Sequence, residues 1–399
     1  MIKLKNIYYI TLILVVCLFT VSPEVLLGAG SAGTSAADFL ELGIGSRPLS
    51  MGEAFTSEIN DINSIYYNPA GLATLKYPMV SVNHQELILD SRFENVSFAY
   101  PLYNGYLGVS NSLFWVPPFD KIDIDGNTVG KVDFYNGAFT AAYGYNLEFM
   151  YVGGSIKYIY QKIDSKFYNS VAFDVGVLKG FYMYSPFKAP VRNFHVGLSI
   201  QNLGVNIENA PLPRLLRFGI SYKLTHWFGF NVDFTENIID ASDLYDFTYG
   251  FDESFRMNIG MELIYMEIIS LRSGYRFNDG GTYSLGIGFH YTIKNVSIIL
   301  DTSFSDSGTF GPNYSFNISF KLIPKVITID DKRNAAIHYN RGIQYFIAND
   351  VETALTEFKI CRDYDPYYKN IEKKIRDIEE LIKLKRENEK LDEELKKKG

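Results

Sequence analysis

The chain has 399 residues, a net charge of −7 at pH 7 and a sequence pI near 5.4, so its charge gives no reason to expect nucleic-acid binding. Aromatic residues make up 16% of it, with 30 Tyr and 30 Phe but only 2 Trp, and the mean hydropathy is −0.03. No internal segment has the roughly 18 consecutive apolar residues of a membrane-spanning helix.

The N-terminus has the features of a secretory signal. Lys3 and Lys5 precede an apolar run over residues 7–21, and the small residues Gly28 and Ala29 follow it. This order predicts a signal peptide over residues 1–29; the alternative is an uncleaved anchor helix, which the short apolar run disfavours.

Only two cysteines occur in the chain. Cys17 lies within the signal, and the residues before it lack the small side chains of a lipoprotein site. After removal of the signal, Cys361 is alone, so we expect no intrachain disulfide and no thiolate metal site.

Residues 30–77 are rich in Gly, Ser, Ala and Pro, which suits turns and short helices better than a membrane strand. Pro69 can start a helical turn, with Asn68 in the capping position. We expect this segment to fold back as a hatch, because a barrel of about fourteen strands is too wide for its own side chains to fill.

From residue 78 to 324 the chain alternates apolar with small or polar residues, which is the period of a β-strand. Tyr283, Leu285, Ile287 and Phe289, for example, alternate with Ser284, Gly286 and Gly288. We predict strands over 78–89, 92–102, 105–115, 132–146, 149–161, 170–184, 192–203, 214–225, 227–236, 255–266, 268–277, 282–292, 296–305 and 313–322. Most are long enough to cross a bilayer at a tilt.

The connections between these strands alternate in length. Tight turns are expected at 104, 146–148, 226, 267 and 293–295, and longer loops at 116–131, 162–169, 204–213 and 237–254. Short turns on one rim and long loops on the other are typical of an outer-membrane β-barrel. The short gap after Leu89 and the long one at 185–191 depart from the alternation. The predicted fold class is therefore an all-β membrane protein, an antiparallel barrel with an N-terminal hatch.

No set of residues indicates catalysis, a metal site or a cofactor. The five histidines, at positions 84, 195, 226, 290 and 338, have no metal-ligand spacing. Asp123 to Asn127 resembles a calcium loop weakly, but the glycine is misplaced and Phe134 stands where the bidentate glutamate belongs, so we expect a turn. Four charged residues are expected to face the lumen, where they either contact a ligand headgroup or satisfy one another: Arg256, Glu262, Arg272 and Arg276.

The hatch segment resembles that of the FadL-like long-chain fatty acid transporter superfamily, and more closely its PorV/PorQ branch and uncharacterised spirochaete-type relatives. The matching pieces are Phe39-Leu40, Gly45-Ser46-Arg47, Met51 to Phe55, Asp61 to Tyr67 and Asn68 to Leu72. The resemblance covers roughly residues 33–322 and implies a fourteen-strand barrel with a hatch. It also implies hatch or gating roles for Met51, Gly52, Asn68, Pro69, Ala70 and Gly71.

After Leu322 the apolar period becomes helical. Residues 335–368 resemble one tetratricopeptide repeat, with Gly342, Tyr345, Ala354, Phe358 and Pro366 at its spacings. His338 and Arg341 depart from its pattern.

A charged helix follows the repeat. Ile371, Ile375, Ile378 and Ile382 suit packing on the repeat, and Leu384, Asn388, Leu391 and Leu395 suit a short coiled coil. Tyr345, Phe358 and Asn388 are the candidate partner contacts. An even strand number places both barrel ends on the short-turn rim, so residues 330–399 are expected in the periplasm.

Two functions fit this reading. One is an outer-membrane channel or transporter for hydrophobic or amphipathic small molecules, as FadL-type members imply. The other is a structural or secretion-accessory protein of the PorV type, whose helical C-terminus recruits a periplasmic protein. An outer-membrane enzyme has no supporting residues.

Overall fold

A computed structural model describes residues 35–185, 192–208, 210–238, 255–277, 281–306, 311–323, 329–365 and 368–398, without the side chains of Ile329 and of 388–398. The signal peptide expected over residues 1–29 lies outside them. The chain divides into two compact units, Met1–Ile323 and Pro324–Gly399. Among the described residues no helix is long and apolar enough to cross a membrane.

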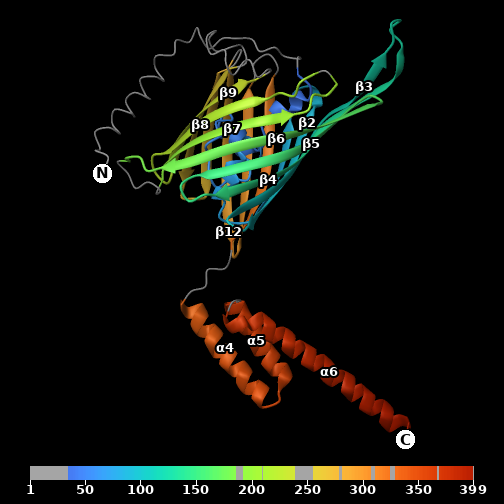
Figure 1. The fold of residues 1–399 in the computed structure, drawn as a ribbon, viewed down its shortest axis with the longest axis vertical. Helices are drawn as coiled ribbons and strands as arrows, with labels where there is room; N and C mark the ends of the chain where they lie inside the picture. The colour runs from blue at the N-terminus through green and yellow to red at the C-terminus, as the bar shows by residue number, and fades with distance from the viewer. Residues whose placement is uncertain are drawn as a thin grey trace. The chain divides into compact units, whose positions relative to one another are not determined.

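The first unit is a closed barrel of fourteen antiparallel strands in which each strand pairs with its sequence neighbours, and β1 closes the ring by pairing with β14 (Figure 1). The strands are β1 (Met79–Glu86), β2 (Arg92–Leu102), β3 (Gly105–Ile122), β4 (Thr128–Asn146), β5 (Tyr151–Ile163), β6 (Lys166–Phe181), β7 (Phe194–Gly204), β8 (Leu215–Lys223), β9 (Phe228–Asn237), β10 (Arg256–Tyr265), β11 (Ile269–Phe277), β12 (Thr282–Ile293), β13 (Val296–Asp306) and β14 (Pro312–Leu322). The predicted fold class is confirmed.

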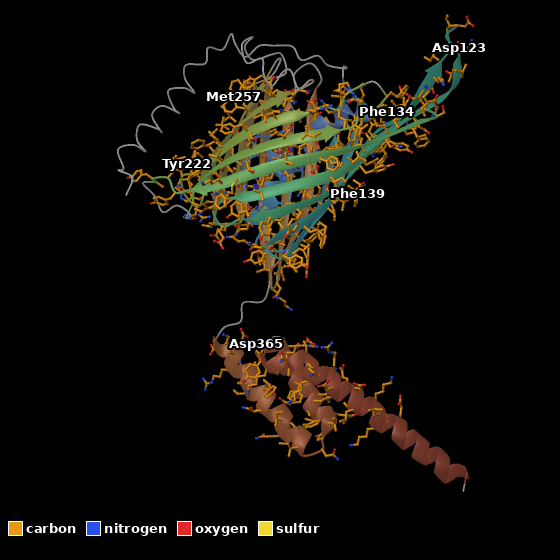
Figure 2. All side chains as sticks on the ribbon, viewed as in Figure 1. Asp123, Phe134, Phe139, Tyr222, Met257 and Asp365 are labelled. Atoms are coloured by element: carbon orange, nitrogen blue, oxygen red, sulfur yellow. The ribbon has the colours of Figure 1, made fainter. Side chains whose placement is uncertain are left out.

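The period of two puts large apolar side chains on the outer wall and small or polar ones in the lumen. In β14, Tyr314, Phe316 and Phe320 are exposed, while Ser315 and Asn317 are buried. Figure 2 shows how densely side chains such as Phe139 cover the outside of the barrel. The outer wall is therefore an apolar surface suited to lipid.

Two connections that we expected to be long loops are strand instead. β3 and β4 pair as far as Ile122 and Thr128, with a register shift after Val116, and form a two-stranded ribbon that extends beyond their neighbours (Figure 1). β5 and β6 pair as far as Ile163 and Lys166. The predicted loops at 116–131 and 162–169 are therefore wrong. We expected loops there because the regular apolar alternation is lost where the strands leave the barrel.

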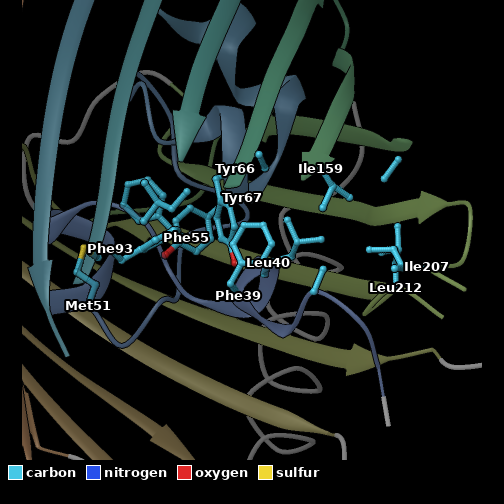
Figure 3. Packing of buried hydrophobic residues seen from close by; sticks show 14 residues of the cluster. Phe39, Leu40, Met51, Phe55, Tyr66, Tyr67, Phe93, Ile159, Ile207 and Leu212 are labelled. Carbon is cyan, nitrogen blue, oxygen red and sulfur yellow. The ribbon is translucent and has the colours of Figure 1, made fainter. Parts of the chain in front are cut away.

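The segment from Ser35 to Tyr77, here called the hatch, lies inside the barrel. It contains η2 (Asp38–Glu41), α2 (Ser46–Ser50), α3 (Ser64–Tyr67) and η3 (Pro69–Thr74). The first three are about one turn long, too short to be stable alone. These short helices are stable because their apolar side chains pack against the barrel wall. Phe39, Phe55 and Tyr67 of the hatch share a core with the wall residues Phe93 and Ile159 (Figure 3).

The second unit contains α4 (Ile329–Ile347), α5 (Val351–Tyr364), η7 (Tyr368–Asn370) and α6 (Ile371–Lys398). Gly342 of α4 lies against the ring of Phe358 from α5, and Asp350 caps α5 by accepting a hydrogen bond from the amide of Thr353. Ile371, Ile375 and Ile378 join the same core, so the first part of α6 covers the α4–α5 hairpin.

Candidate functional site

The hatch docks onto glycines of the barrel wall. A Cβ atom added to Gly153 of β5 would lie 2.3 Å from the carbonyl carbon of Pro69, and one on Gly176 of β6 would lie 2.1 Å from Oδ1 of Asn68. Hatch atoms would lie within 2.9 Å of a Cβ added at other inward-facing glycines, namely Gly108, Gly144, Gly197, Gly219, Gly260, Gly274 and Gly286. No larger residue fits between wall and hatch at these places.

These glycines lie side by side on neighbouring strands. Gly144 is the register partner of Gly153, which is in turn the partner of Gly176. Gly197 pairs with Gly219 in the same way. The cross-strand glycines form flat strips that a main chain can approach closely. Alternation alone places them in the lumen, so their positions could be predicted from the sequence, but what rests on them could not.

The motif Asn68-Pro69-Ala70-Gly71 sits on the first strip. Nδ2 of Asn68 donates to the carbonyl oxygens of Thr56 at 2.9 Å and of Val177 at 3.1 Å, and Oδ1 accepts from the amide of Ala70. Asn68 therefore caps η3 and also ties the hatch to β6. Ala70 and Gly71 are buried.

Met51 and Gly52 rest on another strip, formed by the register partners Gly260 of β10 and Gly274 of β11. The carbonyl oxygen of Met51 would lie 2.5 Å from a Cβ on Gly260, and the amide nitrogen of Gly52 would lie 2.1 Å from one on Gly274. Gly52 has φ of 62°, a conformation that glycine adopts without strain. The two halves of the hatch motif are thus fixed on separate parts of the wall.

Polar side chains of the wall satisfy the hatch backbone. Asp233 accepts hydrogen bonds from the amides of Phe55 and Thr56, at 2.8 and 2.7 Å. Nδ2 of Asn231 donates to the carbonyl of Ala54 at 2.8 Å, and Gln201 donates to that of Tyr67 at 3.0 Å. Since an unpaired buried backbone group is costly, these bonds hold the hatch in one position.

An ionic cluster links the hatch to β10. The guanidinium of Arg47 contacts Asp61 at 2.8 Å and Glu58 at 3.3 Å within the hatch, and Glu262 of the wall at 2.7 Å. Lys223 of β8 contacts Glu58 at 2.6 Å. The charges compensate one another in a buried place, where removal of a single partner is expensive.

The four charged lumen residues of our prediction all take part in ion pairs. Arg272 contacts Glu262 and Asp301, each at 2.7 Å. Arg256 contacts Glu41 of the hatch at 2.8 Å, and Arg276 contacts Glu53 of the hatch at 2.5 Å. The basic residues could be predicted from the sequence, but their acidic partners in the hatch could not, because these lie more than two hundred residues away along the chain.

A cavity of about 730 Å³ opens at the long-loop rim, between the start of the hatch and the wall. Its lining is mainly apolar and includes Phe39, Leu42, Leu87, Phe114, Phe134 and Tyr168. A volume of this size suits a small organic molecule. None of these residues was a candidate in the sequence.

Next to the cavity lies a crevice with room for about 20 Å³ between the hatch and β2–β5. Phe39 lines both, and Ile65, Tyr66 and Phe93 enclose the crevice. Beyond the hatch, on the short-turn side, lies a polar vestibule of about 740 Å³ lined by Asp61, His195, Lys223, Glu262 and Lys321 among others. The hatch residues Phe39, Leu40, Ile44, Ile65 and Tyr66 form one side of the crevice.

The described residues contain no group of three or more His, Cys, Asp or Glu side chains placed to hold a metal ion. Asp123 forms a turn, in which its carboxylate accepts from the amides of Asp125 and Asn127 at 3.0 and 2.8 Å. His84 lies on the outer wall beside Glu94, and His338 pairs with Glu357.

In the helical unit the three candidate partner contacts have different surroundings. Tyr345 is 40% exposed, and its contact with a partner stays a prediction. Phe358 is fully buried, so it joins α4 to α5 and does not touch a partner, which corrects our prediction. Asn388 lies in α6, but its side chain is outside the described part of the chain, as is Pro366.

The profile of the uncharacterised protein family UPF0164 matches residues 30–322. The UPF0164 protein of Treponema pallidum (strain Nichols) is 24% identical over 383 residues, which cover 90% of this chain and 87% of that protein.

The structure is also similar to solved barrels. One is the Ralstonia pickettii toluene transporter TbuX, with a TM-score of 0.47 at 12% identity, covering 70% of this chain and 98% of that one. Another is a Pseudomonas aeruginosa FadL homologue, with a TM-score of 0.47 at 8% identity, covering 73% of this chain and 99% of that one. An even number of antiparallel strands closed into a ring is the fold of outer-membrane proteins.

Proposed function

We propose a transport function for this chain, which belongs to the uncharacterised protein family UPF0164: an outer-membrane channel that passes hydrophobic or amphipathic small molecules. The observation that carries the proposal is the apolar cavity at the long-loop rim, enclosed between hatch and wall. Apolar clefts with a few polar groups are the usual form of a small-molecule site.

The proposed route runs from this cavity through the crevice to the polar vestibule. In the described structure the crevice is closed, because its free volume is that of about one water molecule. Passage requires Phe39, Ile65 and Tyr66 to move away from the wall of β2–β5. The rest of the hatch stays in place, since the glycine strips and the ion pairs hold it.

The proposed orientation puts the long-loop rim outside the cell and residues 330–399 in the periplasm, because short turns usually face the periplasm. The hatch residues Asn68 and Pro69, which rest on β5 and β6, then help to keep the barrel closed.

Uptake of a fluorescent hydrophobic probe by whole cells tests the proposal. Asn68→Ala and Pro69→Ala weaken the docking of the hatch, so both should change the rate of uptake while the barrel still assembles. Deletion of residues 330–399 should leave uptake unchanged. Normal uptake in both hatch variants and in a complete deletion strain would contradict transport.

A second candidate is the accessory role, in which the barrel anchors a helical unit that recruits a periplasmic protein. One observation favours it: the end of α4 exposes Tyr345, Phe346 and Ile347, the last of them 79%. Neighbouring apolar side chains of this kind are a common form of binding surface. If this second function holds, deletion of residues 330–399 should abolish the pull-down of the partner and produce the phenotype of the full deletion. The hatch variants should then have little effect.

A further inference from the structure

The apolar cavity at the long-loop rim contains a pair of carboxamides. Asn136 of β4 and Gln161 of β5 are register partners, and both face the lumen and line the cavity. Both are more than nine-tenths buried, with 4% and 7% exposure. Oδ1 of Asn136 has no hydrogen-bond partner within the described part of the chain.

A third carboxamide, that of Asn313 at the start of β14, also lines the cavity, and its Oδ1 is equally buried and unpaired among the described residues. Buried polar groups of native proteins are normally hydrogen-bonded, so unpaired ones that face a cavity indicate a ligand or water that pairs with them. These residues combine donor and acceptor groups and carry no charge.

The charged residues that line this cavity are both acidic. They are Asp38 and Glu208, and the described lining contains no Lys, Arg or His. In the adjoining crevice, Lys157 is engaged elsewhere, since its ammonium contacts Asp174 at 2.9 Å and Asn202 at 2.7 Å. No cation of the cavity is therefore available to compensate a bound anion.

The same sign of charge recurs around the rim that the cavity opens on. The described parts of the connections between strands there carry five acidic residues and a single basic one, Arg214. The acidic residues are Asp90, Asp123, Asp125, Asp164 and Glu208. A rim of one sign lowers the local concentration of ions with that sign.

We propose that the cavity binds neutral apolar molecules that carry a hydroxyl or similar hydrogen-bonding group, and that it rejects carboxylates. This inference rests on the proposed transport function and names its substrate class. A hydroxyl both donates and accepts, so it pairs with Asn136 and Gln161. A carboxylate loses its hydration, meets no cation and is repelled by Asp38 and Glu208.

Calorimetric titration of the full protein in amphipol tests the proposal with three probes that share the butylbenzene skeleton: butylbenzene, para-butylphenol and para-butylbenzoate. At neutral pH the phenol is neutral and the benzoate is ionised. We expect the phenol to bind about tenfold more tightly than butylbenzene, as one or two hydrogen bonds provide. The benzoate should bind at least about tenfold more weakly than the phenol, as expected for an ion buried without a partner.

Two variants remove the hydrogen-bonding groups with little change of volume. Asn136→Leu and Gln161→Leu should lower the affinity for the phenol to that for butylbenzene. The affinity for butylbenzene itself should not fall. Asn111→Leu, on the outer face of β3, is the matched control and should leave all three affinities unchanged. The change in gel mobility on heating shows whether each barrel is assembled.

The wild-type ranking tests the proposal even if a variant fails to assemble. Equal binding of benzoate and phenol, or an unchanged preference for phenol in both variants, would overturn the proposed selectivity while leaving the cavity as a ligand site. If none of the three probes binds, the cavity is no ligand site, and the proposed transport function fails with the selectivity.

Discussion

Gly153 of the wall and Pro69 of the hatch lie so close that a methyl group on Gly153 would stand 2.3 Å from the carbonyl carbon of Pro69. Its neighbour Gly154 faces outward, and a methyl group there would lie 3.5 Å from its nearest neighbour, the carbonyl oxygen of Asp174. The two glycines are adjacent in sequence and differ only in the side of the wall that they face.

Gly153→Ala should therefore loosen the hatch, by about 1–3 kcal/mol as for other overpacked sites. Gly154→Ala is the matched control and should have little effect. Limited proteolysis of the hatch in detergent measures the difference. Equal cleavage rates in the two variants would mean that the hatch does not rest on this strip.

Arg47→Met should also release the hatch, because it leaves Glu58, Asp61 and Glu262 without a shared partner. Loss of one member of a buried ion pair costs about 3–5 kcal/mol. The urea concentration at which the hatch becomes accessible to protease should fall. Lys162→Met removes a pair with the half-exposed Asp133 and should not change it. A similar fall in both variants would argue against a special role of the Arg47 cluster.

Ile318→Arg places a charge on the outer face of β14. At the middle of a bilayer such a charge costs about 2–4 kcal/mol. The variant should assemble poorly and should change its gel mobility at a lower temperature than the wild type, whereas Ile318→Leu should not. Wild-type melting of the arginine variant would show that this face does not meet lipid.

Epitope tags test the orientation. A tag within residues 120–128, at the tip of the β3–β4 ribbon, should be labelled on intact cells, and a tag after Gly399 should be labelled only after permeabilisation. Surface labelling of the C-terminal tag would reverse the orientation and exclude a periplasmic role for the helical unit.

Cys361 provides a probe of the helical unit. Burial raises the pKa of its thiol to about 11, so the reactive thiolate is scarce at neutral pH. In the mature protein iodoacetamide should react far more slowly between about pH 7 and 9 than with the urea-unfolded protein, as the high pKa implies. Phe358→Ala, which opens the core beside it, should speed the reaction. Rapid alkylation of the native protein would show that this core is not closed.

The barrel could be predicted from the sequence, because the alternation of apolar and polar residues marks each strand of its wall. The strand ends outside the wall could not be read. Pro117, Pro118 and Gly130 and the polar residues around them suggested a loop, but in a two-stranded ribbon both faces meet solvent and the apolar alternation has no cause.

The site was predicted less completely. Arg256 and Arg276 were expected in the lumen, but whether they met a ligand or other residues depended on the hatch. Its carboxylates Glu41 and Glu53 approach from the opposite end of the sequence. Asn136 and Gln161 look like ordinary inward-facing residues until the cavity beside them is known. Local patterns define which face a residue occupies, and only the fold defines what it meets there.

The pairing of β1 with β14 has a consequence for biogenesis. The hatch is translated before every strand that surrounds it, and the ring cannot close until the last strand has been made. The glycine strips leave no room between hatch and wall, so we expect the hatch to be in position when the ring closes. We therefore expect loss of the whole hatch, unlike the single substitutions above, to be seen first as failed assembly of the barrel.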